Sequence, residues 1–312
     1  MLRGRFADVA RRALGKEDKE SILLMKYLPQ IYSVRSRFND EMSRHLFDEA
    51  IVLRLAGHNR FSMPRYDFSE FLSVISKVEF SDPELPCNFL GIPLSIFTVS
   101  LPEGLSAINS LPIVFIGINN LVDLVNKWRQ YFLIRDNFRV IPTAGDVVFD
   151  CGACLGEISV LFGAMVGITG SVHMFDPVPL HNRFLRLQKS YNPTLDNILY
   201  LNEMAVGVVS ETINHGQNNE PKDISPGGLE LNHYQITSLD DYADGLKLDK
   251  VDFIKMDIEG FEIPAIKGAR RIIERYKPRL AISVYHRSDD IWKIPELICQ
   301  LNPNYRFAFG HH

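Results

Sequence analysis

The segment that most constrains the fold of this chain runs from Asp146 to Glu157 and reads DVVFDCGACLGE. Its apolar part predicts a buried strand over Val147–Asp150, and the apolar stretch after it predicts a helix over Glu157–Val166. Gly152 and Gly156 stand between the two. Glycine is needed where the backbone must pass close to a ligand with no side chain between them, and the start of a helix offers unpaired N–H groups. The segment therefore predicts a small-molecule site.

A second acidic strand end indicates the kind of ligand. The predicted strand Ser171–Phe175 is followed by Asp176, about 20 residues past the glycine loop, where an acidic side chain can accept hydrogen bonds from both hydroxyls of a ribose. Dinucleotide sites use the spacing G-x-G-x-x-G, whereas this loop reads D-x-G-x-x-x-G from Asp150. S-adenosylmethionine carries an ammonium, a sulfonium and a ribose diol but no phosphate, and it suits these residues better.

We therefore predict that S-adenosylmethionine is the ligand of this loop. Asp150, Gly152 and Gly156 are expected to hold its methionine part, and Asp176 its ribose. Ala153 is expected to bind the same ligand. The acidic residue that opens the loop suits a ligand with a positive amino group.

From Gly145 onward, predicted strands alternate with predicted helices, which is the pattern of a parallel sheet covered on both faces. The strands are expected at Val147–Asp150, Ser171–Phe175, Ile198–Asn202, Phe253–Met256 and Leu280–Tyr285. The helices are expected at Glu157–Val166, Leu180–Ser190, Phe261–Tyr276 and Ile291–Leu301. In such sheets, ligands bind at the carboxyl ends of the strands.

The whole chain divides by pattern into three parts. Residues 1–105 are expected to form a mixed, mainly helical region of unknown role, because Phe38–Ala56 and Asp67–Val78 carry apolar residues at three- and four-residue intervals. Residues 106–141 form a transition segment. Residues 142–312 form the predicted ligand-binding domain.

The transition segment contains a short strand–glycine–helix pattern. Leu111–Ile118 predicts a buried strand, Gly117 a turn, and Asn120–Phe132 a helix. No second or third glycine follows, so we interpret this pattern as structural rather than as a nucleotide site.

A second group of polar residues follows the predicted strand Phe253–Met256. Lys255, Asp257 and Glu259 alternate along the chain, so they share one face for as long as the backbone stays extended. His286 follows the next predicted strand and could take a proton near neutral pH. These four residues are our candidates for catalysis. A structural ion pair, helix-start charges and an ordinary loop histidine are the alternatives.

Taken together, these motifs resemble the FkbM family of S-adenosylmethionine-dependent methyltransferases. The matching segments are DCGACLGEISVLFG, HMFDPVP, ITSLDDY, VDFIKMDIEGFEIPAIKGARRII and AISVYHRSDDIWKIPELI. The resemblance covers about Pro142 to the C-terminus. It implies an α/β class I methyltransferase fold, Rossmann-like, with a mostly parallel seven-stranded sheet and helices on both faces. It also implies O-methylation, often on sugars or polyketides, and places Met204 and Ala205 where class I enzymes contact the adenine.

Composition disfavours several other classes of protein. The chain has 34 Lys and Arg against 38 Asp and Glu, a formal net charge of -4, so no excess positive charge is available for a nucleic-acid backbone. No apolar stretch approaches the ~20 residues of a membrane span, and the N-terminus lacks the apolar core of a signal peptide. The 4 cysteines are too few for a disulfide framework. We expect a cytoplasmic protein with neither nucleic-acid nor membrane partners.

The function that these patterns favour is an O-methyltransferase that acts on a hydroxyl of a small molecule, such as a sugar or glycoconjugate precursor. No residue is assigned as a metal ligand, although a divalent metal held by Asp257 and Glu259 is a variant of the same reaction. A nicotinamide-dependent oxidoreductase is the alternative enzyme, disfavoured by the missing third glycine. A non-catalytic binding module on the same fold is the other alternative.

Overall fold

A computed structural model describes residues 24, 26–56, 78–81, 88–89, 92–99, 107, 113–118, 130–135, 138–214 and 233–310. The chain divides into two compact units. We call Phe68–Ser283 the larger unit, and Met1–Asp67 with Val284–His312 the smaller unit. Each is described by itself. The predicted helices Asp67–Val78 and Asn120–Phe132 lie almost entirely outside the described residues.

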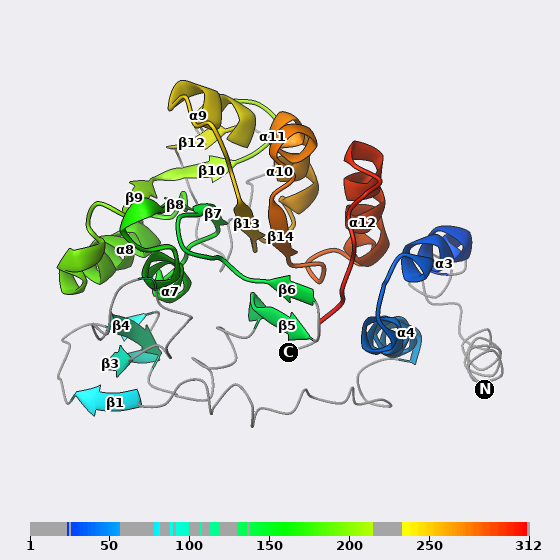
Figure 1. Ribbon diagram of the computed structural model, residues 1–312, viewed down its shortest axis with the longest axis horizontal. Helices are drawn as coiled ribbons and strands as arrows, with labels where there is room; N and C mark the ends of the chain where they lie inside the picture. The colour runs from blue at the N-terminus through cyan, green and yellow to red at the C-terminus, as the bar shows by residue number, and fades with distance from the viewer. Residues whose placement is uncertain are drawn as a thin grey trace. The chain divides into compact units, whose positions relative to one another are not determined.

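The larger unit is built on a parallel sheet with the strand order β14-β13-β7-β8-β9 (Figure 1). Every neighbouring pair in this sheet is parallel. The strands are β7 (Val147–Cys151), β8 (Ser171–Phe175), β9 (Leu199–Asn202), β13 (Phe253–Met256) and β14 (Arg279–Ile282). The predicted parallel α/β architecture is confirmed, but the described residues place five strands in this sheet, not the seven predicted.

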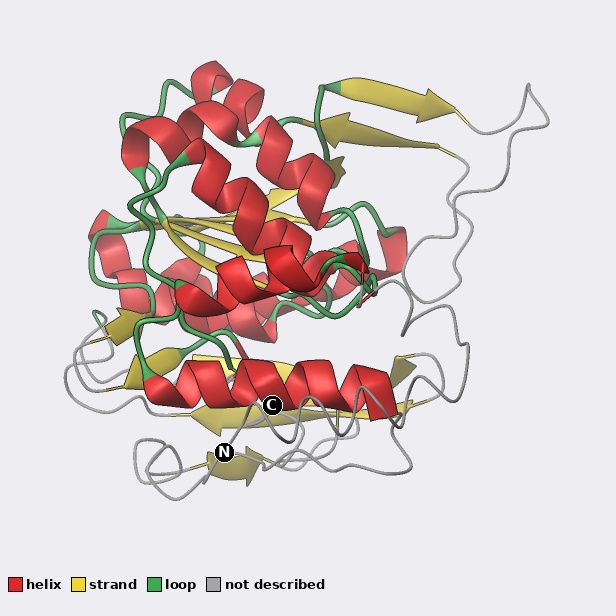
Figure 2. Ribbon diagram, turned by 90° about the vertical axis from the view of Figure 1, so that its right-hand side faces the viewer, coloured by secondary structure: helices red, strands yellow, loops and turns green. Residues whose placement is uncertain are grey.

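Helices of this unit pack on both faces of the sheet; Figure 2 colours helices red and strands yellow. The described helices of the larger unit are α7 (Glu157–Val166), α8 (Pro179–Tyr191), α9 (Leu239–Gly245), α10 (Glu262–Gly268) and α11 (Arg270–Tyr276), with 3-10 turns η1 (Gly167–Thr169) and η2 (Pro193–Leu195). Val148 and Val172 face the apolar residues of α7. Phe149 and Phe175 point to the other face, where their ring centroids lie 5.7 and 4.8 Å from that of Tyr242 in α9.

The prediction of one continuous helix over Phe261–Tyr276 is wrong, because this segment forms two helices, α10 and α11. Gly268, at the end of α10, packs so closely on Gly207 that a Cβ atom there would lie 1.9 Å from the Gly207 carbonyl oxygen. The carboxylate of Asp240 then accepts hydrogen bonds from the N–H groups of Arg271 and Ile272, at 2.9 and 3.0 Å. These bonds pair the N–H groups at the start of α11, which have no partner within the helix. The break between α10 and α11 is therefore stabilised by Asp240, a residue outside the predicted helix.

The strand predicted at Leu111–Ile118 is present as β4 but belongs to a different, antiparallel sheet. Gly117 lies inside β4 opposite Ser95, so the turn predicted at Gly117 is wrong. The strands of this sheet are β1 (Val78–Ser81), β2 (Asn88–Phe89), β3 (Ile92–Val99) and β4 (Ile113–Ile118). Because the described residues between 78 and 99 form strands, the expectation of a mainly helical segment 1–105 fails in that part.

Side-chain amides of α8 hold β4 in place. Gln188 accepts from the N–H of Ile116 at 3.0 Å and donates to its carbonyl at 2.6 Å. Asn192, just past the end of α8, accepts from the N–H of Val114 at 2.9 Å and donates to its carbonyl at 2.6 Å. The backbone of β4 is thus paired with two side chains of the helix region beside it.

Two further β structures complete the described part of the larger unit. A hairpin of β5 (Leu133–Arg135) and β6 (Phe138–Val140) precedes the parallel sheet. A three-stranded sheet follows β9 and consists of β10 (Met204–Val206), β11 (Glu211–Asn214) and β12 (His233–Thr237).

The smaller unit contains α3 (Leu28–Ser36), α4 (Glu41–Ala56) and α12 (Asp290–Leu301). Trp292 of α12 is buried and stacks on Tyr27 with ring centroids 5.7 Å apart. The helix predicted from Phe38 begins instead at Glu41, because the Asp40 carboxylate accepts a hydrogen bond from the N–H of Ser43 at 2.7 Å and so caps it. Among the helices that the structure describes, none has the length and apolar character needed to cross a membrane.

Candidate active site

Most of the predicted site residues of the larger unit lie at one edge of the parallel sheet. Because β7, β8, β9 and β13 run in the same direction, their carboxyl ends meet at that edge. The glycine loop follows β7 and Asp176 follows β8, while Met204 and Ala205 come shortly after β9 and Asp257 directly after β13. The fold therefore brings together residues that are far apart in the sequence.

The two glycines of the loop have backbone conformations that L side chains rarely adopt. Gly152 has φ +81° and Gly156 φ +84°. A Cβ atom on Gly152 would lie 1.9 Å from the backbone oxygen of Asp257, and one on Gly156 would lie 2.6 Å from Leu185 of α8. The N–H groups of Gly152 and Ala153 donate to the carbonyl of Phe175. Packing within the protein thus accounts for both glycines, and their contact with a ligand stays a prediction.

Asp150 is enclosed by protein. It lies opposite Lys255 in the pairing of β7 with β13, and its side chain is 0% exposed against 3% for that of Lys255. Asp150 Oδ1 lies 3.0 Å from Lys255 Nζ, and Ser159 of α7 donates to Oδ2 at 2.5 Å. Asp150 therefore supports the loop from inside the fold, while the direct contact with a ligand ammonium that we predicted stays untested.

Lys255 also holds the glycine loop itself. Its ammonium donates to the carbonyl of Gly152 at 2.6 Å and to that of Cys151 at 3.3 Å. Burial alone lowers the pKa of Lys255, but the carboxylates of Asp150 and Asp257 outweigh burial and raise this pKa above its ordinary value. Lys255 is therefore a permanent cation at neutral pH that anchors the loop and does not take up protons.

Asp176 is buried at the end of β8, where sequence analysis expects the ribose. Its Oδ2 accepts from the N–H of Cys154 and its Oδ1 from the N–H of Val178, both at 2.9 Å. His181 Nδ1 lies 3.0 Å from Oδ1. The carboxylate thus ties the glycine loop to the start of α8.

Met204 and Ala205 lie in β10, which pairs in parallel with β12. Both residues are partly exposed, although the sheet continues into the buried Val206. They follow the end of β9 and so extend the row formed by the glycine loop and Asp176. This is the position that the family resemblance assigns to the adenine.

Asp257 follows β13 and faces the glycine loop across the sheet edge. Its N–H donates to the carbonyl of Cys151 at 3.1 Å. The hydroxyl of Tyr131 donates to Asp257 Oδ2. Lys255 Nζ lies 4.9 Å from the centroid of the Tyr131 ring. The carboxylate of Asp257 is thus half-buried, with a phenol hydroxyl and an ammonium beside it.

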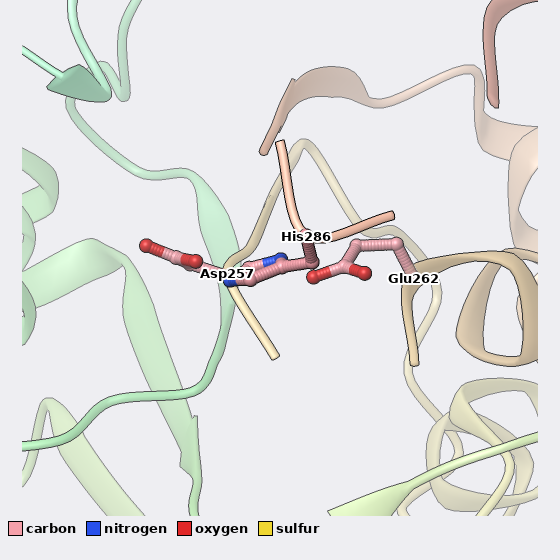
Figure 3. A group of neighbouring side chains, drawn as sticks. All are labelled: Asp257, Glu262 and His286. Carbon is pink, nitrogen blue, oxygen red and sulfur yellow. The ribbon is translucent and has the colours of Figure 1, made fainter. Parts of the chain in front are cut away.

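Glu259 does not share a face with Lys255 and Asp257, so that expectation is wrong. The strand ends at Met256, and Glu259 has the left-handed φ of +57° and is exposed. The metal variant of the reaction thereby loses the shared face on which it was based. Glu262 is the buried acid of this loop, and its Oε1 accepts from the N–H of Ile258 at 2.9 Å. Asp257 and Glu262 are among the side chains labelled in Figure 3.

His286, also labelled in Figure 3, belongs to the smaller unit. The strand expected to run to Tyr285 ends at Ile282, so His286 does not directly follow a strand end. Its ring lies against that of Tyr285, with centroids 4.2 Å apart. The role of His286 as a base stays a prediction.

Sequence reasoning missed several residues that shape this site. Ser159 and Glu262 carried a usable signal, because each is a polar residue on an otherwise apolar helix segment, which often indicates a buried hydrogen bond. Tyr131 carried none, since it lay within the helix predicted over Asn120–Phe132, where a single tyrosine fits many surroundings. The omitted residues are Tyr131, Ser159, His181 and Glu262.

Comparison with known proteins identifies a family. The methyltransferase FkbM domain profile matches residues 150–309. No curated protein matches the chain. The crystal structure of methyltransferase FkbM from Methylobacillus flagellatus KT is 20% identical with a TM-score of 0.55, and the match covers 95% of this chain and 59% of that one. This chain thus spans less than two thirds of that protein's length.

A more remote match is fibrillarin from Aeropyrum pernix, solved in complex with natively bound S-adenosyl-L-methionine. It is 13% identical with a TM-score of 0.33, and the match covers 66% of this chain and 84% of that chain. At 20% identity the likeness to the Methylobacillus structure concerns the fold alone, and nothing is argued from the fibrillarin match. The domain profile, in contrast, covers just over half of the sequence. This chain belongs to the FkbM methyltransferase family.

Proposed function

We propose that this chain transfers a methyl group from S-adenosylmethionine to a hydroxyl of a small-molecule acceptor. Family membership supports a methyltransferase. The observation that carries the choice of donor is the row at the sheet edge, in which the glycine loop, Asp176 and the Met204–Ala205 pair follow three adjacent parallel strands. Such a row suits a ligand made of an amino acid, a ribose and a base.

The residues at this edge fit the proposed donor, with one revision of their roles. The charges of Asp150 and Lys255 neutralise each other beneath the glycine loop. The ligand ammonium would therefore meet backbone carbonyls and the dipole of this ion pair in place of an unpaired carboxylate. Asp176 accepts from two backbone N–H groups and lies beside His181 Nδ1, and a carboxylate has about four acceptor sites. Capacity for one ribose hydroxyl therefore remains at Asp176.

The proposed chemistry is a displacement at the methyl carbon. When bound, S-adenosylmethionine supplies a methyl group on a sulfonium, which is already activated. The acceptor oxygen forms its bond to the methyl carbon as the carbon–sulfur bond breaks, and alignment of these atoms contributes most of the rate. We assign the proton of the hydroxyl to the carboxylate of Asp257, because this carboxylate lies at the sheet edge directly beside the glycine loop.

The acceptor is proposed to approach over the loop that follows β13. Glu259 and Phe261 are exposed there, Phe261 to 39%. A carboxylate next to an aromatic ring offers both hydrogen bonds and an apolar face. A sugar or polyketide carries hydroxyls on a partly apolar frame and matches both features.

Titration calorimetry with S-adenosylhomocysteine and with NAD tests the donor. We expect the first to bind and the second not to bind. The reverse result would indicate an oxidoreductase, and binding of neither would indicate a non-catalytic module.

Labelled S-adenosylmethionine, supplied with extracts of the source organism, then identifies what the protein methylates. In that assay Asp257→Asn should lower turnover at least ~10²-fold, the size of a general-base contribution. Its affinity for S-adenosylhomocysteine should change little. Full turnover by Asp257→Asn would remove Asp257 as the base.

A further inference from the structure

Tyr131 makes a contact that the established family relationship does not assign. Its side chain is 7% exposed and belongs to the main apolar core of the larger unit. At the same time its hydroxyl reaches the sheet edge and donates to Asp257 Oδ2. A tyrosine whose ring is buried in the core has little freedom to move its hydroxyl, because only two side-chain torsions are available to it.

The ring of Tyr131 also has a charged neighbour. Lys255 Nζ lies 4.9 Å from the ring centroid, within the range of a cation–π interaction. The same ammonium binds the carbonyl of Gly152 and pairs with Asp150. Tyr131 is therefore fixed by its core packing and by the cation that anchors the glycine loop.

A hydrogen bond to one carboxylate oxygen limits rotation of the carboxylate about its last torsion. With Oδ2 held by Tyr131, the direction of Oδ1 is set as well. Since methyl transfer depends on the alignment of the reacting groups, a displacement of about 1 Å can lower the rate on the order of 10²-fold. Control of this single torsion is thus enough to affect turnover.

We propose that Tyr131 is a positioning residue for Asp257, supplied by the part of the chain that precedes the residues 150–309 matched by the family profile. This inference rests on the proposed function, in which Asp257 receives the proton of the acceptor hydroxyl. The transition segment thereby contributes directly to the active site, and the family domain alone would lack this contact.

Tyr131→Phe tests the inference, because it removes the hydroxyl and keeps the ring in the core and against Lys255. In the methyl-transfer assay we expect kcat to fall about 10- to 100-fold. The KM for S-adenosylmethionine and the affinity for S-adenosylhomocysteine should stay within about twofold. Tyr276→Phe is the matched control, since it removes a hydroxyl that donates to the carbonyl of Leu248 at 3.0 Å in the same unit.

A double-mutant cycle separates positioning from a general loss of structure. If Tyr131 acts through Asp257, Tyr131→Phe should cause no further fall in kcat in the Asp257→Asn background. A fall of the same size in both backgrounds, or a wild-type kcat in Tyr131→Phe, would overturn the inference.

Carbon-13 NMR of the ring Cζ atoms of labelled tyrosine provides a measurement that needs no acceptor. The signal that disappears in Tyr131→Phe identifies Tyr131, and we expect Asp257→Asn to shift it. An unshifted signal would overturn the contact itself. If wild-type protein fails to bind S-adenosylhomocysteine, the proposed function fails and Tyr131 loses its role with it, whereas intact binding with an unchanged Tyr131→Phe kcat counts against Tyr131 alone.

Discussion

At the scale of single residues, the two loops of the candidate active site are held together by backbone atoms. The Cα atom of Gly152 lies against the carbonyl of Asp257, and the N–H of Asp257 donates to the carbonyl of Cys151. Lys255 binds the carbonyls of both Cys151 and Gly152. The position of Asp257 therefore depends on the conformation of the glycine loop, which couples the proposed donor and proton-acceptor sites.

Gly152→Ala tests this coupling, with Gly145→Ala as its control. Both glycines have positive φ, at +81° and +84°, but a Cβ on Gly145 meets no atom closer than Thr169 Oγ1 at 3.4 Å. The conformational cost of about 1–2 kcal/mol applies to both variants, and overpacking adds about 1–3 kcal/mol only for Gly152→Ala. Urea denaturation measures the free energy of unfolding of both variants. Equal losses would show that the backbone of Asp257 moves away from the new Cβ atom with no loss of stability.

Lys255→Met tests whether the buried pair is as strong as its surroundings suggest. The variant leaves the carboxylate of Asp150 buried without its cation, which should lower the free energy of unfolding by about 3–5 kcal/mol. Arg270→Met removes the exposed pair with Glu274 and should cost less than about 1 kcal/mol. Adding Asp150→Asn to Lys255→Met should restore part of the loss. Thermal unfolding reports all of these, and a Lys255→Met loss no larger than that of Arg270→Met would contradict the argument.

At the scale of elements, the sequence predicted what local patterns determine. The strands β7 and β8 and the helices α7 and α8 follow from short-range apolar periodicity, and the glycine loop and Asp176 follow from spacing along one segment. The break between α10 and α11 depends on Gly207 and Asp240, which are remote in sequence. The ion pair of Asp150 with Lys255 could not be predicted either, because it depends on the pairing of β7 with β13. Non-local contacts thus account for most of what could not be predicted.

One element carries a titratable group whose effect on stability has a definite sign. His173 in β8 is buried between Ser171 and Tyr242, and burial lowers its pKa to about 4 from an ordinary 6.5. Between these values the unfolded chain binds a proton that the folded chain does not. Stability from this group is therefore complete above pH 6.5 and falls as the pH drops towards 4.

We expect this linkage to cost about 2 kcal/mol at pH 5 relative to pH 7. His173→Gln does not titrate, so its free energy of unfolding should fall by correspondingly less over the same pH range. Urea denaturation of both proteins at pH 7, 6 and 5 measures the two slopes. Parallel slopes would show that His173 is protonated in the folded state as readily as in the unfolded chain.

At the scale of the whole molecule, the core of the larger unit extends beyond the residues that the family profile matches. Ile113, Phe115, Tyr131 and Ile141 are buried in the same cluster as α7 and β7. All four precede residue 142, where we predicted the domain to begin. The sequence pattern placed the domain boundary at residue 142, where strands begin to alternate with helices. The apolar core, in contrast, continues across residue 142 without a break.

Fragments of the larger unit test where its cooperative boundary lies. Residues 68–283 keep the whole apolar cluster, and we expect them to unfold in a single cooperative transition. Residues 142–283 lose the four core side chains and should show no such transition, because large buried residues each contribute about 2–5 kcal/mol. Circular dichroism during heating distinguishes the two. A cooperative transition of 142–283 at the same temperature would support the boundary drawn from the sequence.

The pairing of β4 with Gln188 and Asn192 has a consequence for association between copies of the chain. One edge of β4 is joined to β3, and the other would present the unpaired backbone groups that template intermolecular sheets. Four helical residues advance about 6 Å and two strand residues about 6.6 Å, so amides spaced one helical turn apart match alternate residues of a strand. α8 thus imitates a neighbouring strand for a short distance only, since the two repeats drift apart. The side chains of Gln188 and Asn192 thus occupy the edge of β4 that an incoming strand would need. Because a helix offers no further strand edge, the sheet cannot grow beyond α8 on this side.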